Sequence, residues 1–245
     1  MIDLHCHLLP GVDDGPETMD EAMDAARAAV ADGIRTLVLT PHIIPGLYDN
    51  KRRGLQAVFD DFARRLKTEG IPLEVRLGGE VRICPELFDL LSDDDLPFLG
   101  TVDGYRILLL EFPHEMIPIG SDKLVTMLLR QRIRPLIAHP ERNEAVMDAP
   151  DRIRPFVELG CWLQLTAASL AGRFGELEEE TAWQLIDAGW NCVVATDSHN
   201  VTSRPPHLSL GRDALASRRG TAFALDHVRN KPANILGVPR LALVA

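Results

Sequence analysis

Short apolar segments that end in a histidine or a carboxylate recur along the whole chain, and this recurrence limits the folds that it can adopt. Six of them are Ile2–His7, Leu37–His42, Leu77–Glu80, Ile107–Glu111, Leu136–His139 and Val193–His199. Such a segment is typical of a β-strand with a polar group just past its C-terminal end. In β/α barrels, this end of the strands carries the chemistry. The pattern therefore predicts a functional site built from many strand ends.

The hydrophobic periodicity predicts seven strands in alternation with helices. The predicted strands are Ile2–His5, Thr36–Thr40, Leu73–Leu77, Arg106–Leu110, Pro135–Ala138, Cys161–Leu165 and Cys192–Thr196. The predicted helices are Glu17–Asp32, Lys51–Glu69, Pro85–Leu91, Ser121–Arg132, Asp151–Leu159, Glu176–Ala188 and a helical tail from His207 to Leu236. This alternation predicts a parallel sheet. Because candidate ligands follow six of the seven strands, a closed or nearly closed barrel is favoured over an open sheet, in which chemistry gathers at one switch point.

The overall composition argues against several classes of function. The 245 residues include 26 Lys and Arg against 36 Asp and Glu, and the formal net charge of -10 disfavours a nucleic-acid groove or an anionic membrane surface as partner. No apolar run reaches the roughly 18 residues that a membrane-spanning helix needs. The length is typical of one α/β domain, so we expect a single domain over residues 1–245.

The cysteines and the missing motifs argue against other chemistries. Cys6, Cys84, Cys161 and Cys192 form no C-x-x-C pair, and no leader precedes His5, so reduced thiols in a cytoplasmic protein are expected. No cysteine is followed six positions later by an arginine, which argues against a cysteine-based phosphatase. No G-x-x-x-x-G-K-[ST] loop, G-x-S-x-G elbow or G-x-G-x-x-G turn follows a strand, so nucleotide, serine-hydrolase and dinucleotide sites are disfavoured.

Two pairs of candidate metal ligands are each separated by a single residue. His5 and His7 flank Cys6, and Asp197 and His199 form a second pair with the same spacing. Because side chains alternate along a strand, both members of a pair point to the same side, and Cys6 is expected to pack inward behind the site. Two neighbouring imidazoles chelate a divalent metal well. The alternative, two unrelated histidines near the N-terminus, is disfavoured because the other strand ends carry the same kinds of group.

Further candidate ligands lie in the first loop and after other strands. Asp14 is expected to reach the metals, whereas its neighbour Asp13 is expected to cap the next helix or to support the site. His42 follows a proline, and Glu80 follows two glycines and is placed to bridge two metals. A lone carboxylate at Glu111, at the end of an apolar strand, would be costly to bury without a cation.

The candidate ligands outnumber what one ion uses. With His139 included, the nine candidates are His5, His7, Asp14, His42, Glu80, Glu111, His139, Asp197 and His199. A tetrahedral or octahedral ion takes about four to six ligands, so two metals are the minimum and three fit the set. Imidazole and carboxylate ligands without thiolate suit Mn, Fe or Zn rather than a structural zinc.

Two arginines near these motifs are predicted to bind phosphate. Arg142 follows His139 by three positions, and Arg204 follows His199 by five. An arginine fork matches phosphoryl oxygens and stabilises charge that develops in a transition state. A surface salt bridge is the alternative for either arginine.

The remaining histidines and the tryptophans lack such a pattern. His114 and His227 are expected at the surface or in loops, and His207 is assigned no role. The three tryptophans expected to pack in the core are Trp162, Trp183 and Trp190.

In their order along the chain, the motifs resemble the PHP (polymerase and histidinol phosphatase) superfamily. They are D-L-H-C-H-L-L-P-G-V-D-D-G, T-P-H, G-G-E, L-E-F-P, A-H-P-E-R, the Leu170–Gly175 segment L-A-G-R-F-G, and T-D-S-H-N with R-P-P-H. Their combination is similar to one branch, the bacterial CpsB/CapC-type manganese-dependent protein tyrosine phosphatases, from Met1 to about Leu236. The resemblance implies a distorted (β/α)7 barrel with its metal site at the C-terminal ends of the strands. It also implies that the nine candidates hold two or three metal ions, with Mn the expected metal.

The same resemblance implies an activity and a partner. Arg142 and Arg204 would grip the phosphate beside Asp14 and His42, and a metal-bound water would attack it without a covalent enzyme intermediate. The expected partner is the tyrosine-phosphorylated tail of a bacterial tyrosine kinase that controls capsule or exopolysaccharide export. The alternatives are a histidinol phosphatase or other small-phosphoester hydrolase, and a non-catalytic metal-binding or kinase-scaffolding module. The sequence leaves the oligomeric state open.

Overall fold

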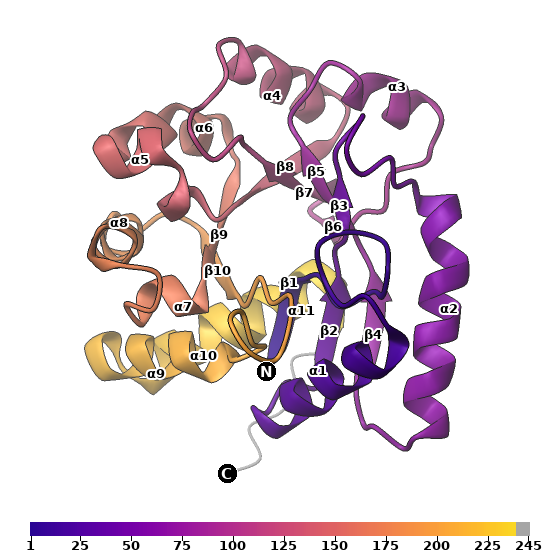
Figure 1. The fold of residues 1–245 in the computed structure, drawn as a ribbon. Helices are drawn as coiled ribbons and strands as arrows, with labels where there is room; N and C mark the ends of the chain where they lie inside the picture. Colours follow the sequence, from indigo (N-terminus) through magenta and orange to yellow (C-terminus); the bar gives the residue numbers. More distant parts are fainter. Residues whose placement is uncertain (239–245) are drawn as a thin grey trace.

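Strands and helices alternate along residues 1–238, the part of the chain that this computed structural model describes (Figure 1). The strands are β1 (Ile2–Cys6), β2 (Thr36–Leu39), β3 (His42–Ile43), β4 (Glu74–Leu77), β5 (Glu80–Arg82), β6 (Gly100–Val102), β7 (Tyr105–Glu111), β8 (Ile133–Ala138), β9 (Trp162–Thr166) and β10 (Cys192–Ala195). The α-helices are α1 (Met19–Ala31), α2 (Arg52–Thr68), α3 (Leu87–Ser92), α4 (Ser121–Arg130), α5 (Glu144–Asp148), α6 (Arg154–Leu159), α7 (Ala167–Leu170), α8 (Glu176–Asp187), α9 (Leu208–Arg219), α10 (Thr221–Leu225) and α11 (Lys231–Leu236). Shorter helical turns are η1 (Pro140–Arg142), η2 (Pro150–Ile153) and η3 (Asp226–Asn230). Every strand and helix predicted from the sequence is present, whereas the short β3, β5, β6, α5 and α7 were not predicted.

The strands form two mainly parallel sheets, and the chain alternates between the two sheets over its first five strands. One sheet has the order β1-β2-β4, and the other has the order β10-β9-β8-β7-β5-β3. The exception to parallel pairing is β6, which pairs with β7 in an antiparallel hairpin. The chain passes from the first sheet to the second within a few residues at two places, from β2 to β3 and from β4 to β5, and it returns to the first sheet between β3 and β4 through α2. The fold is mixed α/β with a parallel sheet, as the sequence predicted.

Small or constrained residues stand where the chain crosses between the sheets. Pro41, which precedes β3, has no N–H to continue the strand ladder. Gly78 and Gly79 separate β4 from β5. A Cβ atom at Gly78 would lie 2.8 Å from Leu99 Cδ2, and one at Gly79 would lie 2.7 Å from Ile43 Cδ1. A side chain at either position would therefore collide with the core around the crossing.

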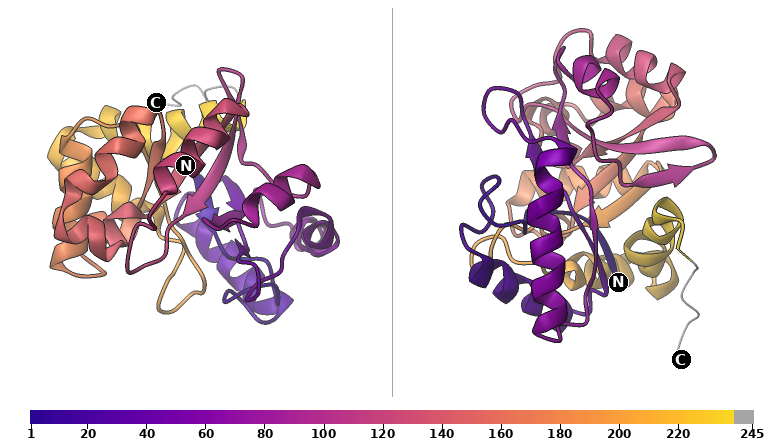
Figure 2. Two further views of the ribbon diagram at one scale, coloured as in Figure 1. Left: turned by 90° about the horizontal axis from the view of Figure 1, so that it is seen from above. Right: turned by 90° about the vertical axis from the view of Figure 1, so that its right-hand side faces the viewer.

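The first strand also contacts the chain that follows the last one. Cys6 and Ser198 form a parallel bridge. The Asp197 N–H donates to the His5 carbonyl at 2.8 Å, and the His7 N–H donates to the Ser198 carbonyl at 2.8 Å. Segments from opposite ends of the sequence are thereby hydrogen-bonded to each other, and Figures 1 and 2 show the helices arranged around the strands.

Alternation along the strands divides the core into two parts. In β7, Leu108 and Leu110 belong to the larger apolar cluster, which includes the helices, whereas Ile107 and Leu109 belong to a smaller inner cluster. Residues of β1, β2, β6, β8, β10 and α11, together with Leu99, complete this inner cluster. Its residues are buried and apolar, in contrast to the polar side chains at the strand ends.

One histidine contradicts the sequence prediction. His227 was expected at the surface or in a loop, but it is only 3 % exposed and lies in η3. Its Nδ1 atom lies 2.8 Å from the Phe223 carbonyl oxygen, and its Nε2 atom lies 3.1 Å from Lys231 Nζ. The prediction was wrong because these partners stand four residues before and after His227, on one helical face. His114 is exposed in a turn, as predicted, and the three tryptophans pack against the core.

All four cysteines are free, and only Cys84 among them is not fully buried. Within residues 1–238, no helix combines the length and the apolar character that crossing a membrane requires.

Candidate metal and phosphate site

All nine side chains predicted to bind metal lie together at the C-terminal ends of the strands. His42 and Glu80 are the first residues of β3 and β5 and stand just past the ends of β2 and β4. The other seven lie near the end of β1 or β7, or in the segments that follow β1, β8 and β10. Their candidate ligand atoms form four overlapping groups, with all atoms of a group within 4.8 Å of one another. The groups are His7, Asp14, His42 and His199; His5, His7 and Glu80; His5, His139 and Asp197; and His42, Glu80 and Glu111. The sequence thus predicted which side chains converge, while their role as ligands stays a prediction.

Glu80 is the most central member of this cluster. Its Oε2 atom lies 3.4 Å from His5 Nε2, 3.3 Å from His7 Nε2 and 3.0 Å from His42 Nδ1. Its Oε1 atom lies 2.9 Å from His139 Nε2, and the side chain is fully buried. A carboxylate that touches four imidazoles is placed to bridge neighbouring cations.

A β-bulge in β1 aims His5 and His7 into the cluster. The pairing register with β2 shifts between Asp3 and Cys6, which gives β1 one extra residue. Leu4 therefore packs in the inner apolar cluster, the next residue, His5, contacts Glu80, and Cys6 packs in the larger core behind them. The H-x-H spacing places both imidazoles on one side, as predicted, and the bulge turns that side toward the site.

Hydrogen bonds from behind hold both rings in place. His5 Nδ1 lies 2.8 Å from Gln164 Oε1, and His7 Nδ1 lies 2.8 Å from Asp13 Oδ2. A ring that donates its Nδ1–H presents the lone pair of Nε2 to the cluster, and such support is common behind metal-binding histidines. Asp13 also accepts from the His42 N–H at 3.0 Å, so it supports the site, which is one of its two predicted roles.

Two supporting residues were not predicted. Gln164 lies in β9, whose end supplies no candidate ligand, and a polar residue within that apolar strand was the only available signal. Arg82 donates from Nε to Glu111 Oε2 at 2.7 Å, and nothing in the sequence pattern linked these two residues.

The donor set fits divalent cations. It consists of five imidazoles and four carboxylates, and four negative charges balance two divalent ions. Glu80 Oε2 and His42 Nδ1 are buried without a hydrogen-bond partner although they lie 3.0 Å apart. Buried polar atoms without partners are rare in native proteins, and a cation between such atoms would satisfy both.

Burial and neighbouring charges shift the pKa values of the clustered side chains in different directions. Burial alone would lower the pKa of His7, but the carboxylates of Asp13, Asp197 and Glu80 raise it well above its usual value. Burial raises the pKa of Glu111 to about 7, with Glu80 as a further cause. Burial lowers the pKa of His139 to about 4. Cations at this cluster would replace the protons on His7 and Glu111.

Two candidate ligands have an unusual backbone conformation. His139 has a φ of 31° and Asp197 has a φ of 53°, both in the left-handed region that residues other than glycine rarely adopt. Each follows the last residue of a strand or comes shortly after it, where the chain turns away from the sheet. Strain of this kind gathers at functional sites because the surrounding structure must maintain it.

Arg142 and Arg204 approach the cluster from its more exposed side. Arg142 Nη1 and Arg204 Nη2 both lie 2.5 Å from Asp197 Oδ2, and Arg204 Nη1 lies 3.0 Å from His199 Nε2. Their side chains are 18 % and 25 % exposed. Asp197 Oδ1, the other oxygen of this carboxylate, lies 3.4 Å from Nε2 of His5. Guanidinium groups are well suited to phosphate oxygens, so the predicted role of these two arginines stays a prediction that their position allows.

Asp14 and His42 lie at the open edge of the site. The Asp14 side chain is 45 % exposed, and its Oδ1 atom lies 3.2 Å from His199 Nε2 and 3.5 Å from His42 Nε2. The ring of Tyr48 stacks on that of His42 with centroids 5.6 Å apart and planes inclined by 9°. The edge of the cluster that solvent reaches is therefore made of a carboxylate and a stacked imidazole.

Comparisons with known sequences point to one family. A sequence profile of the family described as "Capsular polysaccharide synthesis, CpsB/CapC" matches residues 1–237. The tyrosine-protein phosphatase YwqE of Bacillus subtilis (strain 168) is 38 % identical over 207 residues, which cover 84 % of this chain and 80 % of that protein. The tyrosine-protein phosphatase CpsB of Streptococcus pneumoniae is 27 % identical over 241 residues, which cover 96 % of this chain and 98 % of that protein.

A solved structure agrees with the sequence comparison. It comes from a study of YwqE from Bacillus subtilis and CpsB from Streptococcus pneumoniae, described as unique metal-dependent tyrosine phosphatases. It superposes with a TM-score of 0.89 at 34 % sequence identity and covers 98 % of this chain and 97 % of that chain.

Proposed function

The chain belongs to the CpsB/CapC family, as its motifs predicted, and on this basis we propose that it is a metal-dependent phosphatase that removes phosphate from tyrosine in proteins. The observation that carries the proposal is the meeting of Arg142 and Arg204 at Asp197, a residue of the histidine–carboxylate cluster. A phosphate dianion needs cations on several sides, and this arrangement offers two guanidinium groups next to the candidate metal ligands.

The nine clustered side chains would hold two to three divalent ions. We propose Mn as the metal, with Fe or Zn as alternatives that the same donor set accepts. Bound ions of this kind lower the pKa of water and offset negative charge on a phosphoryl group. Asp13 and Gln164 keep the two N-terminal imidazoles oriented toward the ions.

The arginines would position the phosphoryl group. Each guanidinium donates to non-bridging oxygens and offsets the charge that grows in the transition state. Asp197 holds both arginines at the cluster, so a bound phosphoryl group would contact them beside the imidazoles. A tyrosine phenolate leaves readily, so the chain needs no dedicated general acid.

Asp14 would orient the attacking water. Partial burial opposes ionisation of its carboxyl group, but the hydrogen bond with His199 lowers its pKa, so it is ionised at neutral pH. An ionised, half-exposed carboxylate accepts a hydrogen bond from water and directs the oxygen lone pair at phosphorus. Hydrolysis would then proceed without a covalent enzyme intermediate, because the four candidate ligand groups consist of imidazoles and carboxylates and contain no cysteine.

The wider context follows from the family. We propose that the substrate is the tyrosine-phosphorylated tail of a bacterial kinase that controls capsule or exopolysaccharide production, which the description of the family as capsular polysaccharide synthesis supports. Four unpaired cysteines support a reducing, cytoplasmic environment. The hydrogen bonds between β1 and the segment after β10 support a distorted (β/α)7 barrel that forms a single PHP-type domain.

A side-by-side assay tests the proposal. Hydrolysis of a phosphotyrosine peptide and of histidinol phosphate is measured with Mn²⁺ and with EDTA. Preference for the peptide, lost in EDTA and restored by Mn²⁺, is the expected result. Preference for histidinol phosphate would overturn the substrate, and no turnover of either by the metal-loaded protein would overturn the activity.

A further inference from the structure

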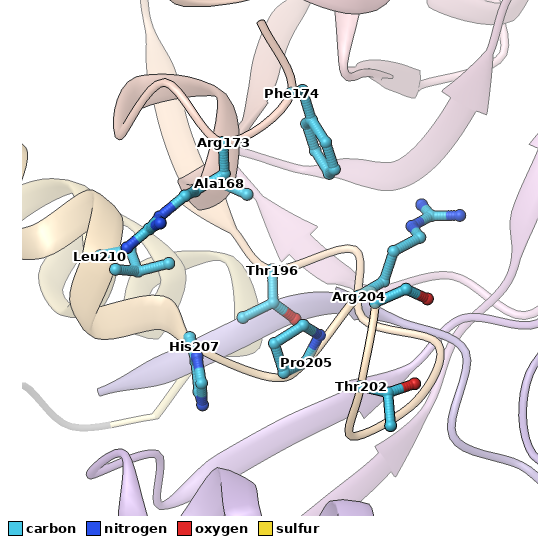
Figure 3. A pocket seen from close by; sticks show the side chains of 10 residues that line it. Ala168, Arg173, Phe174, Thr196, Thr202, Arg204, Pro205, His207 and Leu210 are labelled. Atoms are coloured by element: carbon cyan, nitrogen blue, oxygen red, sulfur yellow. The ribbon is translucent and has the colours of Figure 1, made fainter.

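The Leu170–Gly175 segment contributes nothing to the metal cluster, yet it forms a wall of a pocket beside it (Figure 3). The pocket has a volume of about 360 Å³ and lies between this segment and the loop that follows β10. Its lining includes Arg173, Phe174, Thr196, Arg204, Pro205 and Leu210.

The pocket begins where the proposed phosphate site ends. Arg204 lines it, and the guanidinium carbon of Arg142 lies 4.8 Å from the centroid of the Phe174 ring. Both arginines also contact Asp197 Oδ2. A phosphate held by the two guanidinium groups therefore has Phe174 and the pocket as its immediate neighbours.

The lining has the chemistry of a site for an aromatic ring. Phe174, Pro205 and Leu210 offer apolar surface at one part of the pocket, and the rest of the lining is mainly polar, with Arg173 and Arg204 as its arginines and Thr196, Thr202, Ser203 and His207 as its other polar residues. No carboxylate lines the pocket, so nothing repels a dianion at its mouth. Aromatic rings pack well against other rings and aliphatic side chains.

The wall is held rigidly from behind. The Glu141 carboxylate accepts from the Thr166 N–H and from Ser169 Oγ, each at 2.8 Å, and so fixes both the end of β9 and α7. Gly172 has a φ of 66° and Gly175 has a φ of 143°, so the turns on both sides of Phe174 need glycine. A backbone restricted in this way needs less ordering when a ligand binds.

We infer that this pocket receives the aromatic ring of the phosphotyrosyl side chain and that Phe174 is the residue that selects aryl over alkyl phosphoesters. The inference rests on the proposed function, whose substrate class it deepens. A phosphoserine side chain has no ring and leaves the surface of Phe174 in contact with water. On this inference, Phe174 makes the protein prefer phosphotyrosine, although it lies next to the arginines and outside the metal cluster.

Binding of two non-hydrolysable anions tests the inference without turnover. Phenylphosphonate and methylphosphonate are titrated calorimetrically into the Mn²⁺-loaded protein. Wild type is expected to bind phenylphosphonate more tightly, and Phe174→Ala is expected to lose about 10-fold of that affinity, the size of an aromatic contact. Affinity for methylphosphonate should change by less than about 2-fold if only the contact with the ring is lost. Phe174→Tyr should keep the preference, and Leu177→Ala, an exposed position outside the pocket, should match wild type.

Three outcomes would overturn the inference. Wild type has no preference between the anions; Phe174→Ala leaves the preference intact; or Phe174→Ala weakens both anions equally, which would mean that the ring only holds Arg142. Hydrolysis of a phosphotyrosine peptide is measured on the same wild-type sample, so that failure of the pocket inference can be told from failure of the proposed function. An active wild type with no aryl preference overturns the pocket alone, whereas an inactive metal-loaded wild type overturns both.

Discussion

The Nδ1 atom of His7 lies 2.8 Å from Asp13 Oδ2, so a residue that is not itself a candidate ligand sets the direction of one that is. We predict that Asp13→Asn weakens the binding of Mn²⁺ by about 10- to 100-fold, the usual effect of removing a carboxylate behind a metal-binding histidine. The asparagine keeps the size of the side chain. Calorimetric titration of the metal-free protein measures the change.

The control for this variant is Asp24→Asn. Asp24 is exposed, pairs with Arg27 on the surface of α1, and lies outside the cluster. It should bind Mn²⁺ like wild type. Equal affinity of Asp13→Asn and Asp24→Asn would contradict the supporting role of Asp13.

Arg142→Lys tests whether the fork geometry matters in addition to charge. Lysine keeps the positive charge but cannot donate two parallel hydrogen bonds. We predict that kcat/KM for a phosphotyrosine peptide falls by about 10²- to 10³-fold, as for the loss of one positioned donor to a transition state. The content of bound Mn²⁺, measured by elemental analysis, should stay the same. A parallel loss of metal would assign Arg142 to the cluster instead.

The stability of the metal-free protein should fall as pH rises above about 6.5, the ordinary pKa of histidine. Although burial opposes it, nearby carboxylates raise the pKa values of His5 and His7, so the folded state binds these protons more tightly than the unfolded state. The stabilisation is fully present below the unfolded pKa and is lost as pH rises through the folded values. Glu111, with its pKa raised to about 7, acts in the same direction.

Urea unfolding in EDTA at pH 6.5 and 8.5 measures this effect. We expect the free energy of unfolding to drop by about 1–2 kcal/mol, the order of one unit of pKa shift at one or two groups. His7→Gln should remove much of the slope. With Mn²⁺ present the slope should reverse, because metal binding needs deprotonated imidazoles. A slope in EDTA that is unchanged by His7→Gln would contradict this assignment.

Gly78→Ala and Gly54→Ala should change stability in opposite directions. At Gly78 a Cβ atom would lie 2.8 Å from Leu99 Cδ2 and 2.9 Å from Val38 Cγ1, both in the buried core. Overpacking of this kind typically costs about 1–3 kcal/mol. Gly54 lies in α2 with nothing within 4 Å of an added Cβ, so alanine there should add about 0.5–1 kcal/mol through helix propensity. Thermal unfolding of both variants against wild type gives the comparison.

Periodicity and strand-end chemistry predicted much of this molecule from the sequence. The pattern at Ile107–Glu111 is an example, because a continuous apolar run that ends in a carboxylate predicts a buried strand with a candidate ligand at its end. The bulge in β1 could not be predicted, since it depends on pairing with β2 rather than on local preference. The supporting roles of Gln164 and Arg82 were not predicted, because a single polar residue in a strand acquires such a role only from its neighbours across the sheet. The short strands β3 and β5 were not predicted, because two or three residues are too few to show a hydrophobic periodicity.

His5 and Asp197 stand near opposite ends of the chain, yet their side chains lie 3.4 Å apart, and Asp197 donates its N–H to the His5 carbonyl. On a ribosome, the first of these residues emerges long before the second exists. The two candidate ligand groups that include Asp197 or His199 therefore cannot be complete until the segment after β10 has been made. A truncated chain that ends before β10 would keep the residues of the other two groups and would lose the carboxylate that contacts Arg142 and Arg204.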